Sequence, residues 1–228
     1  MLPPEACAHE KEILHSRQLL DRLRERIETG TDFENIIRLC GYGNIYPGQL
    51  SDEVFSGFNG LSLAEGAKKA GMDPLQWLLT ILSTEKEPPS MLDFITCEED
   101  IRCALRDPGT AVISDSIYPA DGNYHPRVAG TFSRVIEKYV MRESVLSLTE
   151  AVRRMTSLPA QRLGIRDRGV LKKGYKADIC LFDPAAVKER AEYGKALIHS
   201  EGMAYVLING EIALERGSVR HGHAGQCI

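Results

Sequence analysis

The 228-residue sequence lacks long apolar runs and any concentration of basic charge. No stretch reaches the ~18 apolar residues of a membrane-spanning helix, and the start, Met1-Leu2-Pro3-Pro4, has no basic region followed by an apolar core. The formal net charge of −4 leaves no surplus of Lys and Arg for binding phosphates. These absences argue against a membrane protein and against a nucleic-acid partner, and we expect a cytoplasmic protein.

The cysteines are scattered along the chain, and no pair has the spacing of a metal or disulfide motif. The six cysteines are Cys7, Cys40, Cys97, Cys103, Cys180 and Cys227. Because there is no CxxC pair, neither a zinc ribbon nor a disulfide framework is indicated, and we expect free, mostly packed thiols. The basic run Arg22, Arg24 and Arg26 lies among acidic residues and predicts a solvated helix face.

Helical periodicity and capping patterns mark the predicted helices. Apolar residues recur at helical spacing over residues 9–28, which predicts one amphipathic helix that buries Ile13, Leu20, Leu23 and Ile27. Capping boxes predict further helix starts at Ser62/Glu65, Thr96/Glu99 and Ser147/Glu150. Gly71, Pro108-Gly109 and Gly164 predict the corresponding helix ends.

Short apolar runs alternate with helices in the middle of the chain and give way to β structure after Gly169. Strands are predicted at Met91–Ile95 and Ala111–Ile113, with helices at 98–106 and 147–155, which is the alternation of parallel α/β structure. Later strands are predicted at Ile179–Phe182, Met203–Ile208 and Glu211–Glu215, and Asn209-Gly210 predicts a type I′ hairpin turn. We place a domain boundary near Arg166–Gly169.

Asp115 is the catalytic candidate that the residues themselves indicate. It follows the apolar run Ala111–Ile113 and Ser114 directly, and catalytic carboxylates of α/β barrels lie at the ends of strands. A strand-end aspartate is also a common helix cap or turn former, so its position alone does not decide between the two roles.

The order of motifs around Asp115 resembles the D-aminoacylase (N-acyl-D-amino-acid deacylase) family of metal-dependent amidohydrolases. Ser114-Asp115-Ser116 leads into His125-Pro126-Arg127, then Gly130-Thr131-Phe132 and Met155-Thr156-Ser157-Leu158-Pro159-Ala160. The segment from Gly169 through Ala177-Asp178 to Phe182-Asp183 is similar to a signature of the wider superfamily, and Val206–Gly210 resembles its closing hairpin. The resemblance covers essentially the whole chain.

This resemblance implies a (β/α)₈ barrel with an appended β-sandwich and zinc at the carboxyl-terminal mouth of the barrel. It implies that Asp115 is the general base, which accepts a proton from the metal-bound water as hydroxide attacks an amide carbonyl and returns it to the leaving amine. His125 and Arg127 are expected in the loop after the strand, where they could bind a substrate carboxylate. The alternative is that they fix this loop to neighbouring helices.

Three other acidic or histidine motifs are expected to have no catalytic role. Asp178 and Asp183 belong to the β signature and are expected to be turn residues. His221-Gly222-His223 has the spacing of a metal pair, but it follows the last predicted strand, and we expect a solvated tail.

The sequence departs from the family in having no counterpart of its metal-binding histidines. A closed barrel also needs about 200–250 residues, so we expect an α/β fold with a partial (β/α)₈ barrel in residues 1–168, an insertion within 1–90, and a β-sandwich portion in 169–228. Zinc is expected in the parent enzyme, whereas this chain alone is expected to bind none and to be inactive. A fragment, one subunit of a split enzyme and a degenerate descendant remain alternatives, of which we favour the first.

The predicted function is therefore that of the carboxyl-terminal part of an amidohydrolase acting on N-acyl-D-amino acids. Expected partners are a small N-acyl amino acid in the parent enzyme and either a complementing amino-terminal chain or further copies of this chain. Two alternatives are a non-catalytic interaction module and another amidohydrolase, such as a cyclic-imide hydrolase or a dihydroorotase-like enzyme.

Overall fold

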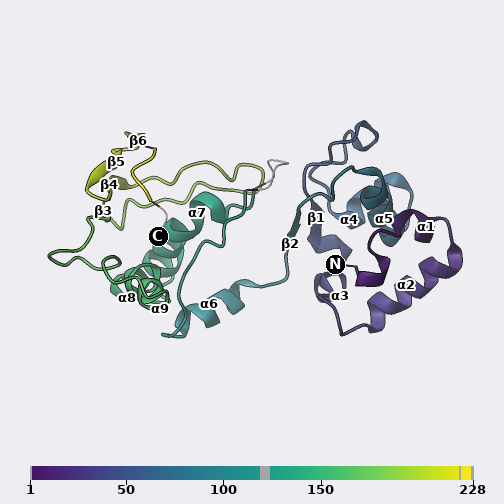
Figure 1. Ribbon diagram of the computed structural model, residues 1–228, viewed down its shortest axis with the longest axis horizontal. Helices are drawn as coiled ribbons and strands as arrows, with labels where there is room; N and C mark the ends of the chain where they lie inside the picture. Colours follow the sequence, from purple (N-terminus) through teal and green to yellow (C-terminus); the bar gives the residue numbers. More distant parts are fainter. Residues whose placement is uncertain (1, 119–123, 221, 227–228) are drawn as a thin grey trace. The chain divides into compact units, whose positions relative to one another are not determined.

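The computed structural model describes residues 2–118, 124–220 and 222–226, which contain both helices and strands (Figure 1). The chain divides into two compact units, Met1–Cys97 with Tyr118–Asn123 and Glu98–Ile117 with Tyr124–Ile228. The domain boundary predicted near residue 168 lies inside the second unit and stays a prediction. None of the helices in the described residues has both the length and the apolar character needed to cross a membrane.

The first unit begins with two helices where the sequence predicts one. After the short η1 (Pro4–Ala6), α1 (Glu10–Leu14) ends at His15, and α2 (Arg17–Thr29) begins after Ser16. The break arises because the Ser16 hydroxyl accepts the Leu19 N–H and caps a new helix. The predicted apolar face is confirmed, since Ile13, Leu20, Leu23 and Ile27 are all buried.

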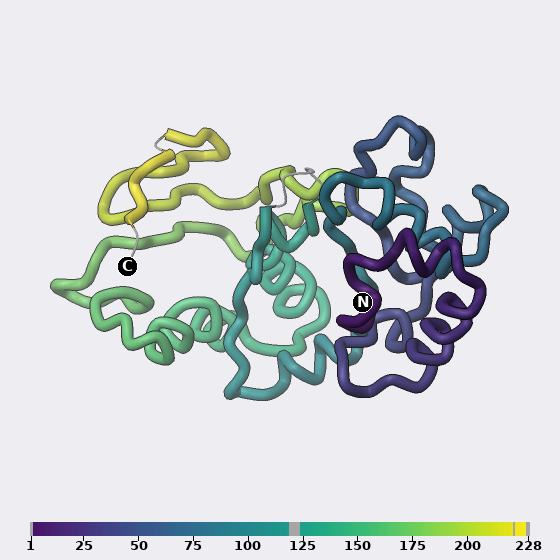
Figure 2. The backbone as a smooth tube through the Cα atoms, turned by 45° about the vertical axis from the view of Figure 1, so that its right-hand side comes forward, coloured from purple at the N-terminus to yellow at the C-terminus, as the bar shows by residue number. Residues whose placement is uncertain are grey.

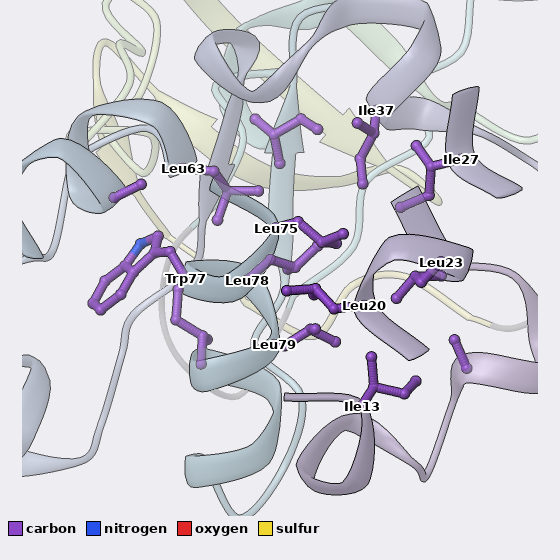
Figure 3. Packing of buried hydrophobic residues seen from close by; sticks show 14 of the residues in the cluster. Ile13, Leu20, Leu23, Ile27, Ile37, Leu63, Leu75, Trp77, Leu78 and Leu79 are labelled. Atoms are coloured by element: carbon purple, nitrogen blue, oxygen red, sulfur yellow. The ribbon is translucent and has the colours of Figure 1, made fainter. Parts of the chain in front are cut away.

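The remaining helices of this unit share one hydrophobic core with that face. They are α3 (Ile36–Cys40), η2 (Tyr42–Asn44), η3 (Glu53–Phe55), α4 (Leu63–Ala70) and α5 (Pro74–Thr84). The predicted capping box is confirmed at Ser62 and Glu65, and Gly71 ends α4 in the left-handed conformation. Figure 3 shows Leu75, Leu78 and Leu79 of α5 facing the buried side chains of α1 and α2, and these residues form one core cluster.

The predicted strand at 91–95 is present in shortened form as β2 (Met91–Asp93). It pairs with β1 (Ile45–Pro47) in antiparallel register, with Ile45 opposite Asp93. All strand pairings within the described residues are antiparallel, so the parallel pairing expected from the sequence does not form among them.

The second unit contains a helical layer with its own core. It consists of α6 (Glu98–Arg106), α7 (Arg127–Arg134), the π-helix η4 (Val135–Arg142), α8 (Leu148–Met155) and α9 (Ser157–Arg162). The predictions of helices at 98–106 and 147–155 are confirmed. Ser147 accepts the Glu150 N–H as predicted, but the Glu150 carboxylate binds Arg153 and Arg154, so only half of this capping box forms.

The predicted strand at Ala111–Ile113 is wrong, because this run is extended without a partner strand. Its Val112 N–H donates to the carbonyl of Arg154 at 3.0 Å, and Ile113 is exposed. A strand needs a neighbouring strand for its backbone hydrogen bonds, and the described part of the chain offers none at this position. The run is therefore held by a helix end.

The predicted β unit is confirmed as a four-stranded antiparallel sheet in the order β3-β4-β5-β6. Its strands are β3 (Ile179–Phe182), β4 (Met203–Ile208), β5 (Glu211–Glu215) and β6 (Ser218–Val219). Asn209 and Gly210 have φ values of 52° and 87°, as a type I′ turn requires. Between β3 and β4 the chain runs from the sheet along α7 and back, as Figures 1 and 2 show.

Two smaller predictions have mixed outcomes. Arg24 and Arg26 lie at the surface in ion pairs with Asp21, Asp73, Glu5 and Asp32, which agrees with a solvated helix face. The described cysteines are free, but the prediction that most are packed is wrong, since four of the five are exposed. Cys103, for example, lies on α6, where Leu105 alone is buried.

Candidate functional site

Asp115 lies at the end of the extended run that α8 holds through Val112. Its φ of 47° is left-handed, a conformation that aspartate tolerates better than most residues and that often occurs at functional sites. Its carboxylate is 70% exposed. The local backbone therefore places the Asp115 carboxylate at the surface of the second unit, where a ligand can reach it.

Arg127 holds the Asp115 carboxylate from the start of α7. Its Nη1 lies 3.1 Å from Asp115 Oδ2. The structure places Arg127 in the first turn of a helix and not in the predicted loop, because α7 begins directly after Pro126. An ion pair this exposed contributes only about 0–1 kcal/mol to stability, so we interpret its effect as orientation of the carboxylate.

Two buried polar atoms beside this ion pair have no hydrogen-bond partner within the described residues. They are Ser116 Oγ and Arg127 Nε. Leaving a buried donor or acceptor unpaired costs about 1–3 kcal/mol, and such groups are rare in folded proteins. Both atoms belong to residues that adjoin the Asp115 carboxylate, and both are shielded from solvent.

His125 connects the start of α7 to the segment between β3 and β4. Its Nδ1 accepts the Arg127 N–H at 3.0 Å, and its Nε2 lies 3.0 Å from Tyr193 Oη. The two rings also make an edge-to-face contact, with centroids 5.2 Å apart. Burial raises the pKa of the Tyr193 hydroxyl, so that group stays protonated around neutral pH.

A cluster of charges centred on Glu98 joins α6 to the helix that carries Arg127. Glu98 Oε1 lies 2.5 Å from Lys138 Nζ and 2.9 Å from Arg134 Nη2, while Oε2 accepts the Tyr139 hydroxyl at 2.8 Å. The hydrogen bond from Lys138 is the main cause that lowers the pKa of Glu98 to about 2. Arg134 also binds Glu189 at 3.0 Å, which ties the β3–β4 segment to α7.

The prediction of a turn residue is confirmed for Asp183 but is wrong for Asp178, which lies directly before β3 and binds residues far along the chain. Asp178 Oδ1 accepts the Asn209 N–H at 2.8 Å, and its Oδ2 binds Arg168. Asp183 Oδ1 accepts the Ala185 N–H at 3.0 Å. His223 is exposed, whereas His221 lies outside the described residues.

The residues gathered around Asp115 do not fit a complete metal site. Across residues 2–118, 124–220 and 222–226, no three His, Cys, Asp or Glu side chains come together as a metal site requires. Asp115 is instead paired with a cation, and both ring nitrogens of His125 are engaged by Arg127 and Tyr193.

The structure brings together all three predicted site residues, Asp115, His125 and Arg127, and adds Ser116 and Tyr193. Ser116 belongs to the motif around Asp115, so its position was visible in the sequence. Tyr193 lies 68 residues beyond His125 and in a different segment of the fold, and no local pattern marks it.

Comparison with known proteins finds similar sequences and similar folds. A profile of the amidohydrolase family matches residues 101–214, which is half of the chain. The chain is 37% identical over 123 residues to an N-acyl-D-aspartate deacylase of Alcaligenes xylosoxydans xylosoxydans, covering 54% of this chain and 24% of the relative. An N-acyl-D-glutamate deacylase of the same organism is 36% identical over 151 residues, covering 66% and 30%.

Solved structures give the same relationship over nearly the whole chain. D-aminoacylase, whose binuclear metal center has been studied structurally, matches with a TM-score of 0.73 and 25% identity over 98% of this chain and 47% of that one. The N-acyl-D-glutamate deacylase from Bordetella bronchiseptica, solved with zinc and a phosphonate inhibitor, matches with a TM-score of 0.66 and 27% identity over 96% and 47%.

Both comparisons also measure how much of each relative the chain covers. It spans 24–30% of the two curated deacylases and about half of the solved chains, at 47%. A dihydroorotase of Lactobacillus gasseri is 30% identical over 100 residues, which cover 38% of this chain and 23% of the relative.

Proposed function

Because the chain belongs to the amidohydrolase family, we propose that it supplies part of an enzyme that hydrolyses linear amide C–N bonds. The deacylase relatives support N-acyl-D-amino acids as the substrate class. The observation that carries this proposal is the exposed Asp115 carboxylate, held by Arg127 beside two buried polar atoms without partners among the described residues.

In this proposal Asp115 is the general base. Its ionised carboxylate accepts a proton from a water molecule while the water oxygen attacks the amide carbonyl carbon. When the C–N bond breaks, the same proton passes to the leaving nitrogen, so the products are a carboxylate and a free amino acid. Such proton transfers contribute about 10²–10⁴-fold to rate.

Arg127 is proposed to bind the carboxylate of the N-acyl amino acid. Its Nη1 faces Asp115 and its Nε is buried, whereas the side chain as a whole is 35% exposed, so the accessible part of the guanidinium would meet the substrate. A charge-assisted hydrogen bond from an accessible N–H would place the substrate beside the base. For His125 the contacts favour the second alternative raised by the sequence, in which it fixes the loop before α7.

The domain organisation is proposed on the same relationship. Residues 1–168 would contribute strands and helices of a (β/α)₈ barrel, including an insertion within 1–90, and residues 169–228 would contribute to a β-sandwich. Since the described residues do not fit a complete metal site, the zinc ligands of the active enzyme would come from other residues, and we expect no turnover by this chain alone.

The test is complementation followed by a single substitution. The chain is mixed with the portion of the Bordetella bronchiseptica deacylase that it does not match, and hydrolysis of N-acetyl-D-glutamate is measured. In an active complex, Asp115→Asn should lower kcat by about 10²–10⁴-fold, because the amide retains the shape but cannot accept the proton. Substrate affinity and folding should change little.

Asp183→Asn is the matched control, because Asn can also accept the Ala185 N–H that Asp183 accepts. It should retain full activity. An Asp115→Asn complex with near-full turnover would remove Asp115 from the mechanism. A complex that opens a cyclic imide but leaves N-acetyl-D-glutamate intact would favour the cyclic-imide alternative.

A further inference from the structure

Tyr193 occupies the tip of a tight turn that reaches from the β3–β4 segment to His125. Glu192 and Lys195 form an isolated antiparallel bridge, in which the Lys195 N–H donates to Glu192 O at 2.8 Å. Gly194 between them has a φ of 80°, a backbone conformation that glycine adopts without strain. The turn thus fixes the direction in which the Tyr193 side chain leaves the backbone.

The hydrogen bonds around His125 determine where its ring proton lies. Nδ1 accepts the Arg127 N–H at 3.0 Å, so Nδ1 carries no proton. The neutral ring therefore carries its proton on Nε2 and donates it to Tyr193 Oη, 3.0 Å away. The Tyr193 hydroxyl is thereby an acceptor for His125, and the two rings also make an edge-to-face contact.

The bond from Arg127 N to His125 satisfies a helix end that has no side-chain cap. Pro126, at the N-cap position, makes no side-chain hydrogen bond, and the first N–H groups of a helix have no partner inside it. His125 supplies that partner for Arg127, the residue whose guanidinium meets Asp115. A continuous series of contacts therefore runs from Tyr193 through His125 and Arg127 to the Asp115 carboxylate.

We infer that Tyr193 is a positioning residue, which holds the His125 ring so that α7 begins at Arg127 with its guanidinium against Asp115. The inference deepens the proposed function and rests on it for its catalytic consequence. Its structural part concerns the first turn of α7 alone. The alternative, in which Tyr193 is a surface residue that merely touches His125, predicts no change in that turn when the hydroxyl is removed.

Tyr193→Phe removes the hydroxyl and leaves the ring contact in place. Hydrogen–deuterium exchange is measured by mass spectrometry on the chain alone, in the peptide that spans residues 124–134. We expect the amides of the first turn of α7 to exchange about two- to tenfold faster, because one ordinary hydrogen bond has been lost. Tyr205→Phe is the matched control, since the Tyr205 hydroxyl bonds Glu215 within the sheet, and it should leave this peptide unchanged.

A second variant separates positioning through His125 from any general loosening of the protein. In His125→Asn the side chain is shorter, but its amide oxygen can still accept the Arg127 N–H, as Asn does at helix starts. The contact with Tyr193 is lost. Tyr193→Phe should then have no further effect on exchange in that background, which makes the two substitutions non-additive. Additive effects would overturn the inference.

Measuring the activity of Tyr193→Phe distinguishes a failure of this inference from a failure of the proposed function. In the complemented enzyme, Tyr193→Phe should lower kcat about two- to tenfold with KM less affected, because it disturbs the orientation of the base. Unchanged exchange in the first turn of α7 would overturn the positioning role, even if Asp115→Asn abolished turnover. Faster exchange without loss of kcat would support the role of Tyr193 at the start of α7 but overturn its role in catalysis.

Discussion

Gly66 of α4 lies against the indole of Trp77, and the fit leaves no room for a side chain. A Cβ at this position would stand 2.5 Å from Trp77 Nε1. Trp77 is itself buried and packs edge-on against Phe55, with ring centroids 5.5 Å apart. The glycine is therefore present for close approach and not for a special backbone angle.

Gly66→Ala should destabilise the first unit even though alanine is the better helix former. Overpacking a core costs about 1–3 kcal/mol, whereas replacing glycine in a helix gains about 1 kcal/mol, so we expect a net loss of about 0–2 kcal/mol. Urea unfolding monitored by Trp77 fluorescence measures it. Gly43→Ala is the control, since nothing lies within 4 Å of its Cβ position, and equal stability of the two variants would contradict this account.

At the residue scale, the sequence predicted the charged residues of the site but not the contacts that hold them in place. Asp115 was predictable because it follows an apolar run and lies within a family motif. Its left-handed backbone and the pairing with Arg127 depend on where α7 begins, and Tyr193 depends on a turn far along the chain. Contacts between segments separated by tens of residues leave no periodic trace in a single sequence.

Glu98 is the charged residue through which α6 and the π-helix η4 stabilise each other. Lys138 and Tyr139 both belong to η4, and their bonds to Glu98 are the reason that its pKa falls from 4.5 to about 2. A carboxyl group with a lowered folded-state pKa stabilises the fold above its unfolded pKa. That contribution is lost as the pH falls from about 4.5 toward 2.

Glu98→Gln should therefore lower stability at pH 7 and flatten the acid limb of the stability curve between pH 4.5 and 2. The measurement is urea unfolding followed by circular dichroism at a series of pH values. Glu211→Gln, on the exposed start of β5, serves as the control and should follow the wild-type curve. A Glu98→Gln curve parallel to that of the wild type would show that this carboxylate is not linked to folding.

At the scale of elements, the predictions that succeeded are those whose signals are local. The Ser62 capping box and the Asn209-Gly210 turn need only residues that are neighbours in sequence, and both form as predicted. The single helix predicted over residues 9–28 failed at Ser16, where a cap competes with helix continuation. The strand at Ala111–Ile113 failed because a strand depends on a partner that the residues themselves cannot specify.

Several large apolar side chains are exposed to solvent in the described residues. Ile113, Ile117, Leu163 and Leu171 are each at least 64% exposed, and the edge strands of the β3–β6 sheet also expose Leu181 and Val219. Unpaired edges with apolar side chains promote association of copies.

We therefore expect the isolated chain to self-associate. Sedimentation velocity should show species larger than a monomer whose amount increases with concentration. Replacing the exposed edge residues in Leu181→Lys/Val219→Lys should reduce association, because charge on an edge strand opposes pairing, whereas Lys173→Arg should not. A compact monomer at all concentrations would contradict this prediction.

The long segment between β3 and β4 also affects the order in which the strands of the sheet pair during folding. A two-residue turn joins β4 to β5, and hairpins of this kind close in about 1–10 μs. β3 is separated from β4 by the segment that Arg134 and Ser133 hold against α7, so closing this longer loop carries a greater entropy cost. The β4–β5 hairpin is thus the natural nucleus, and β3 joins it only as α7 docks, which makes completion of the sheet a late step in folding.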